Sequence, residues 1–120
     1  MKKIIQSVGH AFRGIVAAYR HDQSFALEIN WGLPVYLVVG WFFLPMTSWE
    51  VLLFVGSYLH ILRTELLNTG IEFALDHLHP EIHHNIKRAK DTTSGAVLIA
   101  FVMAIVVVVV LLLRRSGVIE

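Results

Sequence analysis

One segment, residues 92–113, constrains the fold more than any other, because it is a run of 22 residues without a formal charge. A helix of about 20 apolar residues spans the ~30 Å hydrocarbon core of a bilayer. A second uncharged run, of 21 residues, lies between Glu28 and Glu50, and two of its three tryptophans fit the aromatic belts of a membrane interface. The chain is 56% hydrophobic, above the roughly 45–50% typical of soluble domains. We therefore predict an all-α membrane protein.

The 120 residues are expected to form a single integral-membrane domain, residues 1–120. The predicted transmembrane helices are residues 29–48, 51–75 and 92–113. Pro45 and the polar residues after it indicate a short turn between the first two spans. The polar stretch 76–91, which contains Pro80, is expected to be a loop that leads into the third span.

Residues 2–21 are predicted to form a surface helix. Apolar residues recur there at helical spacing: Ile4, Ile5, Val8, Phe12, Ile15, Val16 and Tyr19. Basic and polar residues fall largely on the other face. This pattern is typical of an amphipathic helix that lies in the plane of the membrane interface.

The basic residues predict the orientation of the chain. With three spans, the amino-terminal segment and the 76–91 loop share a side, which holds Lys2, Lys3, Arg13, Arg20, Lys87, Arg88 and Lys90. The other side holds Arg114 and Arg115, and Arg63 falls within a span. Because basic residues concentrate on the cytoplasmic side, the amino terminus and the polar loop are expected in the cytoplasm.

Composition also excludes several classes of function. The chain has no cysteine, so it has neither a disulfide framework nor a thiolate metal site. Its net charge of +1 argues against a nucleic-acid partner, which calls for a clustered basic surface. Neither of the common nucleotide-binding loops, GxxxxGK[ST] or GxGxxG, occurs in it.

A polar stripe inside the second span is the strongest functional signal. Glu65, Asn68, Glu72 and Asp76 fall within an arc of roughly 80° on one helix face. A charged side chain near the bilayer centre costs about 2.5–3.5 kcal/mol on insertion scales, so such residues are candidates for function by default. The stripe runs from headgroup depth to the cytosol, where a lipid headgroup meets soluble reagents. The alternative is a structural stripe that forms hydrogen bonds between helices.

Two further groups of residues bear on metal and phosphate binding. Carboxylates beside Lys87, Arg88 and Lys90 suit a divalent cation with a polyphosphate, although basic residues also flank cytoplasmic helix ends. Asp91 is equally suited to cap the third span. The competing metal site is a Zn²⁺ or Ni²⁺ centre built from His77, His79, His83 and His84. Pro80 interrupts these histidines, which favours a solvated loop instead.

Two motifs together resemble one known family. "ELLNTGIEFALD" (65–76), followed by "RAKDTTSGAVLIA" (88–100), is similar to the prokaryotic membrane lipid kinases, namely diacylglycerol kinase and undecaprenol kinase. The resemblance implies a homotrimer of three-span subunits in the bacterial inner membrane, with a cytoplasmic active site. It implies transfer of the γ-phosphate of ATP, with Mg²⁺, to the hydroxyl of diacylglycerol, giving phosphatidic acid.

The resemblance also implies roles for individual residues. Glu65 matches the catalytic base, and Asn68 matches its supporting amide, one turn away and able to hydrogen-bond it. Asp22 and Glu72 match the metal-binding carboxylates. The implied ATP contacts are Lys3, His10, Asp22, Glu72, Glu81, His83, Lys90 and Asp91. The implied lipid contacts are Glu28, Glu65 and Ser94.

The sequence departs from the family pattern in its first helix. Asp22 stands where the family usually has Glu, His10 where diacylglycerol kinases tend to have Tyr, and Gln6 where they tend to have Lys. "ELLNTGIE" is nearer to the undecaprenol branch, whereas "RAKDTTSGAVLIA" favours diacylglycerol, so undecaprenol kinase is the alternative activity. A small membrane ion carrier that uses the buried carboxylates is the alternative from a different class.

Overall fold

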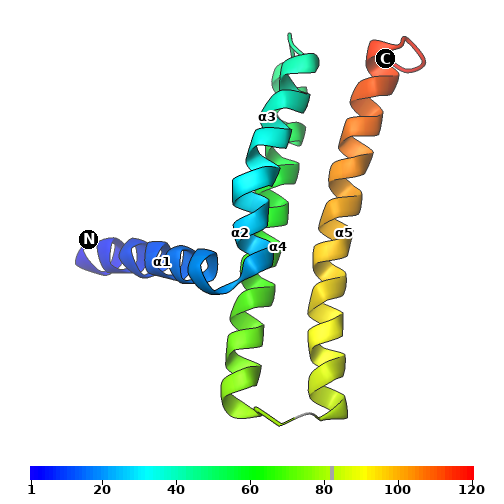
Figure 1. Ribbon diagram of the computed structural model, residues 1–120. Coiled ribbons are helices and arrows are strands. Elements are labelled where there is room, and N and C mark those ends of the chain that lie inside the picture. The colour runs from blue at the N-terminus through cyan, green and yellow to red at the C-terminus, as the bar shows by residue number, and fades with distance from the viewer. Residues whose placement is uncertain (82) are drawn as a thin grey trace.

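The chain is a helical bundle with one helix that projects from its side (Figure 1). The computed structural model describes residues 1–81 and 83–120. Its elements are α1 (Lys2–His21), α2 (Gln23–Leu27), the π-helical turn η1 (Glu28–Gly32), α3 (Leu33–Phe42), α4 (Ser48–Leu78) and α5 (His84–Arg115). The described residues contain no strand, as the sequence predicts for an all-α protein.

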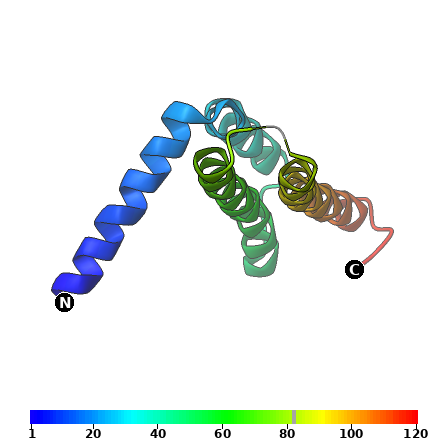
Figure 2. The ribbon, with the colours of Figure 1, turned by 90° about the horizontal axis from the view of Figure 1, so that it is seen from below.

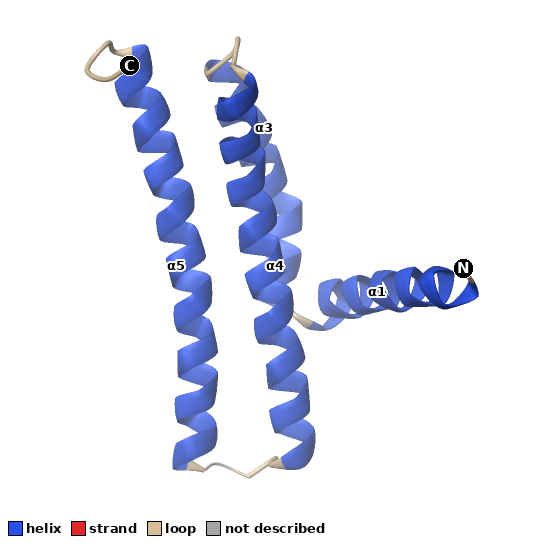
Figure 3. Cartoon of the chain, turned by 180° about the vertical axis from the view of Figure 1, so that it is seen from behind, coloured by secondary structure: helices blue, strands red, loops and turns tan. Residues whose placement is uncertain are grey.

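Three rods form the bundle, and α2, η1 and α3 together make one of them. This rod, α4 and α5 lie side by side, with the α4–α5 connection at one end (Figures 1 and 3). The α3–α4 turn and the carboxyl terminus lie at the other end. Helix α1 leaves the bundle sideways, as the view from below shows (Figure 2). It covers the residues predicted for the surface helix.

The first rod begins and ends earlier than the predicted span 29–48. Asp22 caps α2, because its side chain accepts a hydrogen bond from the Ser24 backbone N–H at 3.0 Å. Glu28 therefore lies within the rod rather than at its entrance. The rod ends at Phe42 with its cap at Phe43, and Pro45 follows two residues after the cap, where proline is common because it cannot continue a helix.

The other two long helices extend beyond the predicted spans 51–75 and 92–113. Helix α4 begins at a capping box formed by Thr47 and Glu50. Helix α5 begins at His84, where the ring of His83 accepts the Asn85 N–H at 3.1 Å. The prediction that Asp91 caps the third span was wrong, since Asp91 lies two turns inside α5 and pairs with Lys87.

Two helical stretches of the described chain are long and apolar enough to cross a membrane. They are Gln23–Phe42 and His84–Arg115. Helix α4, with Arg63, Glu65 and Glu72 in its length, is not one of them, so its crossing remains a prediction. Arg63 donates a hydrogen bond to the ring of His60 at 3.1 Å.

The bundle core lies where α4 packs along α5. Ile61 of α4 is 1% exposed and contacts the small residues Ala100 and Ala104 of α5. Nearer the carboxyl terminus, Phe54 packs with Leu111. Small residues at such an interface allow two helix backbones to approach closely, which is how helices gain packing energy where water does not drive their association.

An ion pair fastens the end of the bundle that carries the carboxyl terminus. Glu50 is 2% exposed, and its Oε2 lies 2.8 Å from Nη1 of Arg115. The same guanidinium donates hydrogen bonds to the carbonyls of Phe43, at 2.6 Å, and Pro45, at 3.0 Å. Arg115 thus joins the end of α5 to the α3–α4 turn and to the start of α4.

We expect Arg115→Met to lower the temperature of thermal unfolding by several degrees, because it leaves a buried carboxylate and two carbonyls without their donor. Arg114→Met is the matched control, since its guanidinium approaches Glu50 only to 3.7 Å. The measurement is thermal unfolding in mild detergent, followed by circular dichroism. Equal shifts for the two variants would contradict this assignment.

Candidate active site

A small pocket collects side chains from three parts of the chain. It encloses about 210 Å³ and is lined by Asp22, Ser24, Glu65, Asn68, Glu72, Ser94 and Val97. The first two come from the α1–α2 junction, the next three from α4 and the last two from α5. The pocket therefore brings together the predicted catalytic pair, both predicted metal ligands and two of the three predicted lipid contacts, Glu65 and Ser94.

Asp22 is held in this pocket by two bonds to its carboxylate. One oxygen accepts the Ser24 N–H of the helix cap, and the other accepts the hydroxyl of Thr69 from α4. Thr69 is 2% exposed. The junction between α1 and the bundle is therefore attached to α4 through the carboxylate that the sequence assigns to metal binding.

Glu65 is 6% exposed, and its Oε2 has no hydrogen-bond partner among the described residues. Asn68 donates its amide to Oε1 of Glu72 at 3.4 Å. The expectation that Asn68 hydrogen-bonds Glu65 was wrong in this arrangement, because the amide turns toward the next acid along the same face. Oδ1 of Asn68 is also buried and without a partner in the described chain.

The oxygen atoms of the pocket suit a magnesium ion that phosphates complete. Mg²⁺ prefers oxygen ligands and typically binds one or two carboxylates together with substrate phosphates. Asp22 and Glu72 supply two carboxylates, and the unpartnered Oδ1 of Asn68 adds a neutral oxygen. Within residues 1–81 and 83–120, no group of three acidic or histidine side chains is close enough to hold an ion alone. The predicted alternative, a zinc or nickel centre of loop histidines, is therefore not formed by the described residues.

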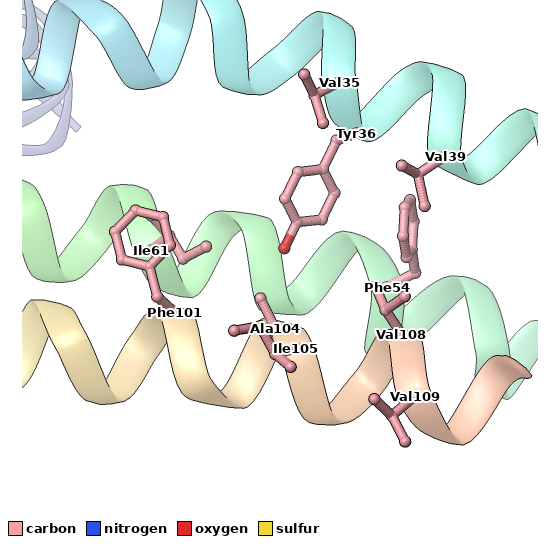
Figure 4. A pocket seen from close by; sticks show the side chains of 10 residues that line it. All are labelled: Val35, Tyr36, Val39, Phe54, Ile61, Phe101, Ala104, Ile105, Val108 and Val109. Carbon is pink, nitrogen blue, oxygen red and sulfur yellow. The ribbon is translucent and has the colours of Figure 1, made fainter. Parts of the chain in front are cut away.

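A larger groove opens beside the pocket and shares Glu65 with it. It encloses about 610 Å³ and is lined on one side by Glu28 and Gly32 of η1. Three of its lining residues, Val35, Tyr36 and Phe101, also line an apolar groove of about 260 Å³ formed by α3, α4 and α5. Figure 4 shows that groove, with Tyr36 pointing from α3 toward α4. An apolar path thus leads from the middle of the bundle to a carboxylate.

The predicted nucleotide contacts near the α4–α5 connection lie outside the pocket and are engaged in local pairs. Lys90 pairs with Asp76, and this hydrogen bond raises the pKa of Lys90. Lys87 pairs with Asp91 at 2.8 Å, which raises the pKa of Lys87. Both bonds favour the cationic form of the lysine, which is also its ordinary form at neutral pH.

Glu81 and His83 lie in the short connection between α4 and α5. Hydrogen bonds from its own backbone N–H and from His79 lower the pKa of Glu81, so it is an anion at neutral pH. His83 caps α5. Both residues are exposed at the end of the bundle.

Lys3 and His10 are the predicted contacts that the structure does not bring near the pocket. Both are exposed on α1, which leads away from the bundle (Figure 2). The ring of His10 is hydrogen-bonded to Arg13 on the same helix. Within one chain, these two side chains and the pocket are separate.

Two residues of the site were missed from the sequence. Thr69 binds Asp22, and the Tyr58 hydroxyl donates a hydrogen bond to the backbone carbonyl of Glu28 at 3.0 Å. Thr69 follows Glu65 by one helical turn, and Tyr58 precedes it by two turns. Both therefore share the face of Glu65, and helical periodicity could have identified them.

Comparisons with known proteins identify the family of the chain. The family model for prokaryotic diacylglycerol kinase matches residues 9–112. The chain belongs to this family. It is 33% identical over 103 residues to the diacylglycerol kinase of Escherichia coli K12, covering 86% of this chain and 83% of that protein.

Two further relatives are similarly distant. The diacylglycerol kinase of Haemophilus influenzae is 33% identical over 97 residues, which covers 81% of this chain and 80% of that protein. The diacylglycerol kinase of Pseudomonas aeruginosa is 32% identical over 103 residues, which covers 86% of this chain and 82% of that protein. These matches confirm the predicted family and, with it, the prediction that the chain is an enzyme of the lipid kinase class. Family membership and the two long apolar helices together identify a membrane protein. Family membership also argues against the alternative prediction of a membrane ion carrier.

Proposed function

We propose that this chain transfers the γ-phosphate of ATP to the hydroxyl of diacylglycerol, giving phosphatidic acid and ADP. One observation carries the proposal. The pocket that joins Asp22, Glu65, Asn68 and Glu72 opens beside an apolar groove of the bundle. Phosphoryl transfer depends mainly on positioning and charge neutralisation, and a lipid substrate needs an apolar path that ends at those groups.

Glu65 is the proposed general base. Its Oε2 is buried and unpartnered, and the side chain lines both the pocket and the groove. It accepts the proton of the lipid hydroxyl as that oxygen bonds to the γ-phosphorus and the bond from the phosphorus to the ADP oxygen breaks. A positioned base of this kind contributes about 10²–10⁴-fold to the rate.

Asp22 and Glu72 are the proposed ligands of Mg²⁺. When bound, the ion neutralises phosphate charge. Asn68 donates to Glu72, and Thr69 donates to Asp22, so each carboxylate has one neighbour on α4 that fixes its position. The proposed contacts of the rest of the nucleotide are Lys3, His10, Glu81, His83, Lys90 and Asp91.

The lipid is proposed to lie in the groove, with Glu28 and Ser94 beside its headgroup. Undecaprenol is the alternative substrate, since its single hydroxyl could reach Glu65 by the same path. Labelled ATP offered with diacylglycerol and with undecaprenol in parallel tests the function. Label in phosphatidic acid supports the proposal, whereas label only in undecaprenyl phosphate, or in neither lipid, contradicts it.

We further propose a homotrimer in the bacterial inner membrane, with three spans per subunit and the amino terminus and active site in the cytoplasm. Helix α1 projects away from its own bundle, which supports contact between its exposed residues and a neighbouring subunit (Figure 2). A polar stripe within a bilayer must also face protein or water. Crosslinking in mild detergent that yields only monomers would contradict this assembly.

We expect Glu65→Gln to lower kcat by at least about 10²-fold, because the amide cannot accept the hydroxyl proton. Expression, assembly and the KM for ATP should change little, since the side chains are nearly isosteric. The measurement is steady-state kinetics with diacylglycerol. A near-normal kcat with a raised KM for lipid alone would make Glu65 a binding residue.

We expect Asp22→Asn to raise the Mg²⁺ concentration needed for half-maximal activity, because one of the two carboxylates becomes neutral. The amide oxygen can still accept the Ser24 N–H of the helix cap, and the amide NH2 can donate to the Thr69 hydroxyl, so the fold should persist. The measurement is a Mg²⁺ titration at saturating ATP. Ser24→Ala is the control, since its bond to Asp22 uses only the backbone. An unchanged titration for Asp22→Asn would remove Asp22 from the metal site.

A further inference from the structure

The π-helical turn η1 sets the position of Glu28 in the first rod. Here the carbonyl of Glu28 accepts the N–H of Leu33, five residues on, instead of the fourth residue as in an α-helix. Such wide turns inside α-helices often occur at functional sites. In this chain the turn carries the acid proposed to lie beside the lipid headgroup.

A second donor comes to the same carbonyl from another helix. The hydroxyl of Tyr58, on α4, donates to the Glu28 carbonyl at 3.0 Å, and Tyr58 is 7% exposed. Its ring packs against that of Tyr36 in a tilted arrangement, with centroids 4.7 Å apart and planes at 48°. Tyr58 therefore binds the first residue of the wide turn in a fixed direction.

Gly32, the last residue of the turn, leaves room for the side chain of Glu28. A Cβ atom at Gly32 would lie 2.2 Å from Oε1 of Glu28 and 2.8 Å from its Cδ. The carboxylate thus folds back over the glycine, and it lines the same groove as Glu65. The π-helical turn, Tyr58 and Gly32 therefore all affect the position of the Glu28 carboxylate.

We propose that Tyr58 is a positioning residue that sets lipid affinity through Glu28. By holding the carbonyl of the wide turn, it fixes the direction in which the Glu28 carboxylate enters the groove, and Gly32 provides the space. This inference rests on the proposed lipid kinase function. It adds a residue on α4 that touches neither the pocket nor the proposed metal ligands.

The test is a double-mutant cycle in the full-length protein, with diacylglycerol and ATP as substrates. Tyr58→Phe should raise the KM for diacylglycerol about 3- to 10-fold, the loss expected for one hydrogen bond, with kcat and the KM for ATP nearly unchanged. In a Glu28→Gln background the same substitution should have less than about a 2-fold effect, because the carboxylate it positions is gone.

Ser57→Ala is the matched control for Tyr58→Phe. It removes a neighbouring buried hydroxyl of α4, which bonds to Phe54 and Tyr36 and does not reach Glu28. The KM for lipid should therefore stay at the wild-type value. Gly32→Ala is the second variant, and it should raise the KM for lipid at least as much as Tyr58→Phe.

Three results would overturn the inference while leaving the proposed function intact. They are an unchanged lipid KM in Tyr58→Phe, an equal effect with and without Glu28, and an equal effect from Ser57→Ala. If Tyr58→Phe is not expressed, Gly32→Ala becomes the test. An unchanged KM for diacylglycerol in Gly32→Ala would then overturn the inference. A wild-type protein that phosphorylates no lipid would instead overturn the proposed function.

Discussion

Polar side chains of α4 bind groups on the other parts of the bundle, and these bonds determine how the helices fit together. The partners are Asp22 for Thr69, the Glu28 carbonyl for Tyr58, Tyr36 for Ser57 and Arg115 for Glu50. In an apolar medium an unpaired polar group costs several kcal/mol, and apolar packing alone does not choose between helix registers. Each bond therefore fixes the axial position of a neighbouring segment relative to α4.

The same constraint determines which acidic side chains of α4 reach the pocket and which reach the groove. Glu65 and Glu72 lie two turns apart on one face of α4, so they meet different surroundings without any change of helix. Glu65 borders the apolar groove as well as the pocket, whereas Glu72 borders the pocket alone and receives the Asn68 amide. This difference in surroundings supports the proposed division between a base for the lipid, Glu65, and a ligand for the metal, Glu72.

The sequence predicted the parts of the structure that depend on periodicity within one helix. The amphipathic pattern of residues 2–21 identified α1, and the spacing of Glu65, Asn68 and Glu72 identified one wall of the pocket. Helix ends were predicted less well, since the cap at Asp22 and the continuation of α5 through Asp91 depend on local hydrogen bonds. The contact between Tyr58 and Glu28 joins two helices, and no pattern along one helix specifies it.

The central claim is that the pocket at Asp22, Glu65 and Glu72 binds the metal–nucleotide complex. Because the chain has no cysteine, Ser94→Cys and Val118→Cys each carry a single nitroxide label. Ser94 lines the pocket, whereas Val118 follows the end of α5, next to the carboxyl terminus, which lies at the end of the bundle away from the α4–α5 connection (Figure 1). The measurement is the nitroxide signal with Mn²⁺ in place of Mg²⁺, before and after a non-hydrolysable ATP analogue is added. The account predicts strong, analogue-dependent quenching at position 94 and little at 118, whereas equal quenching at both positions, or none at 94, would contradict it.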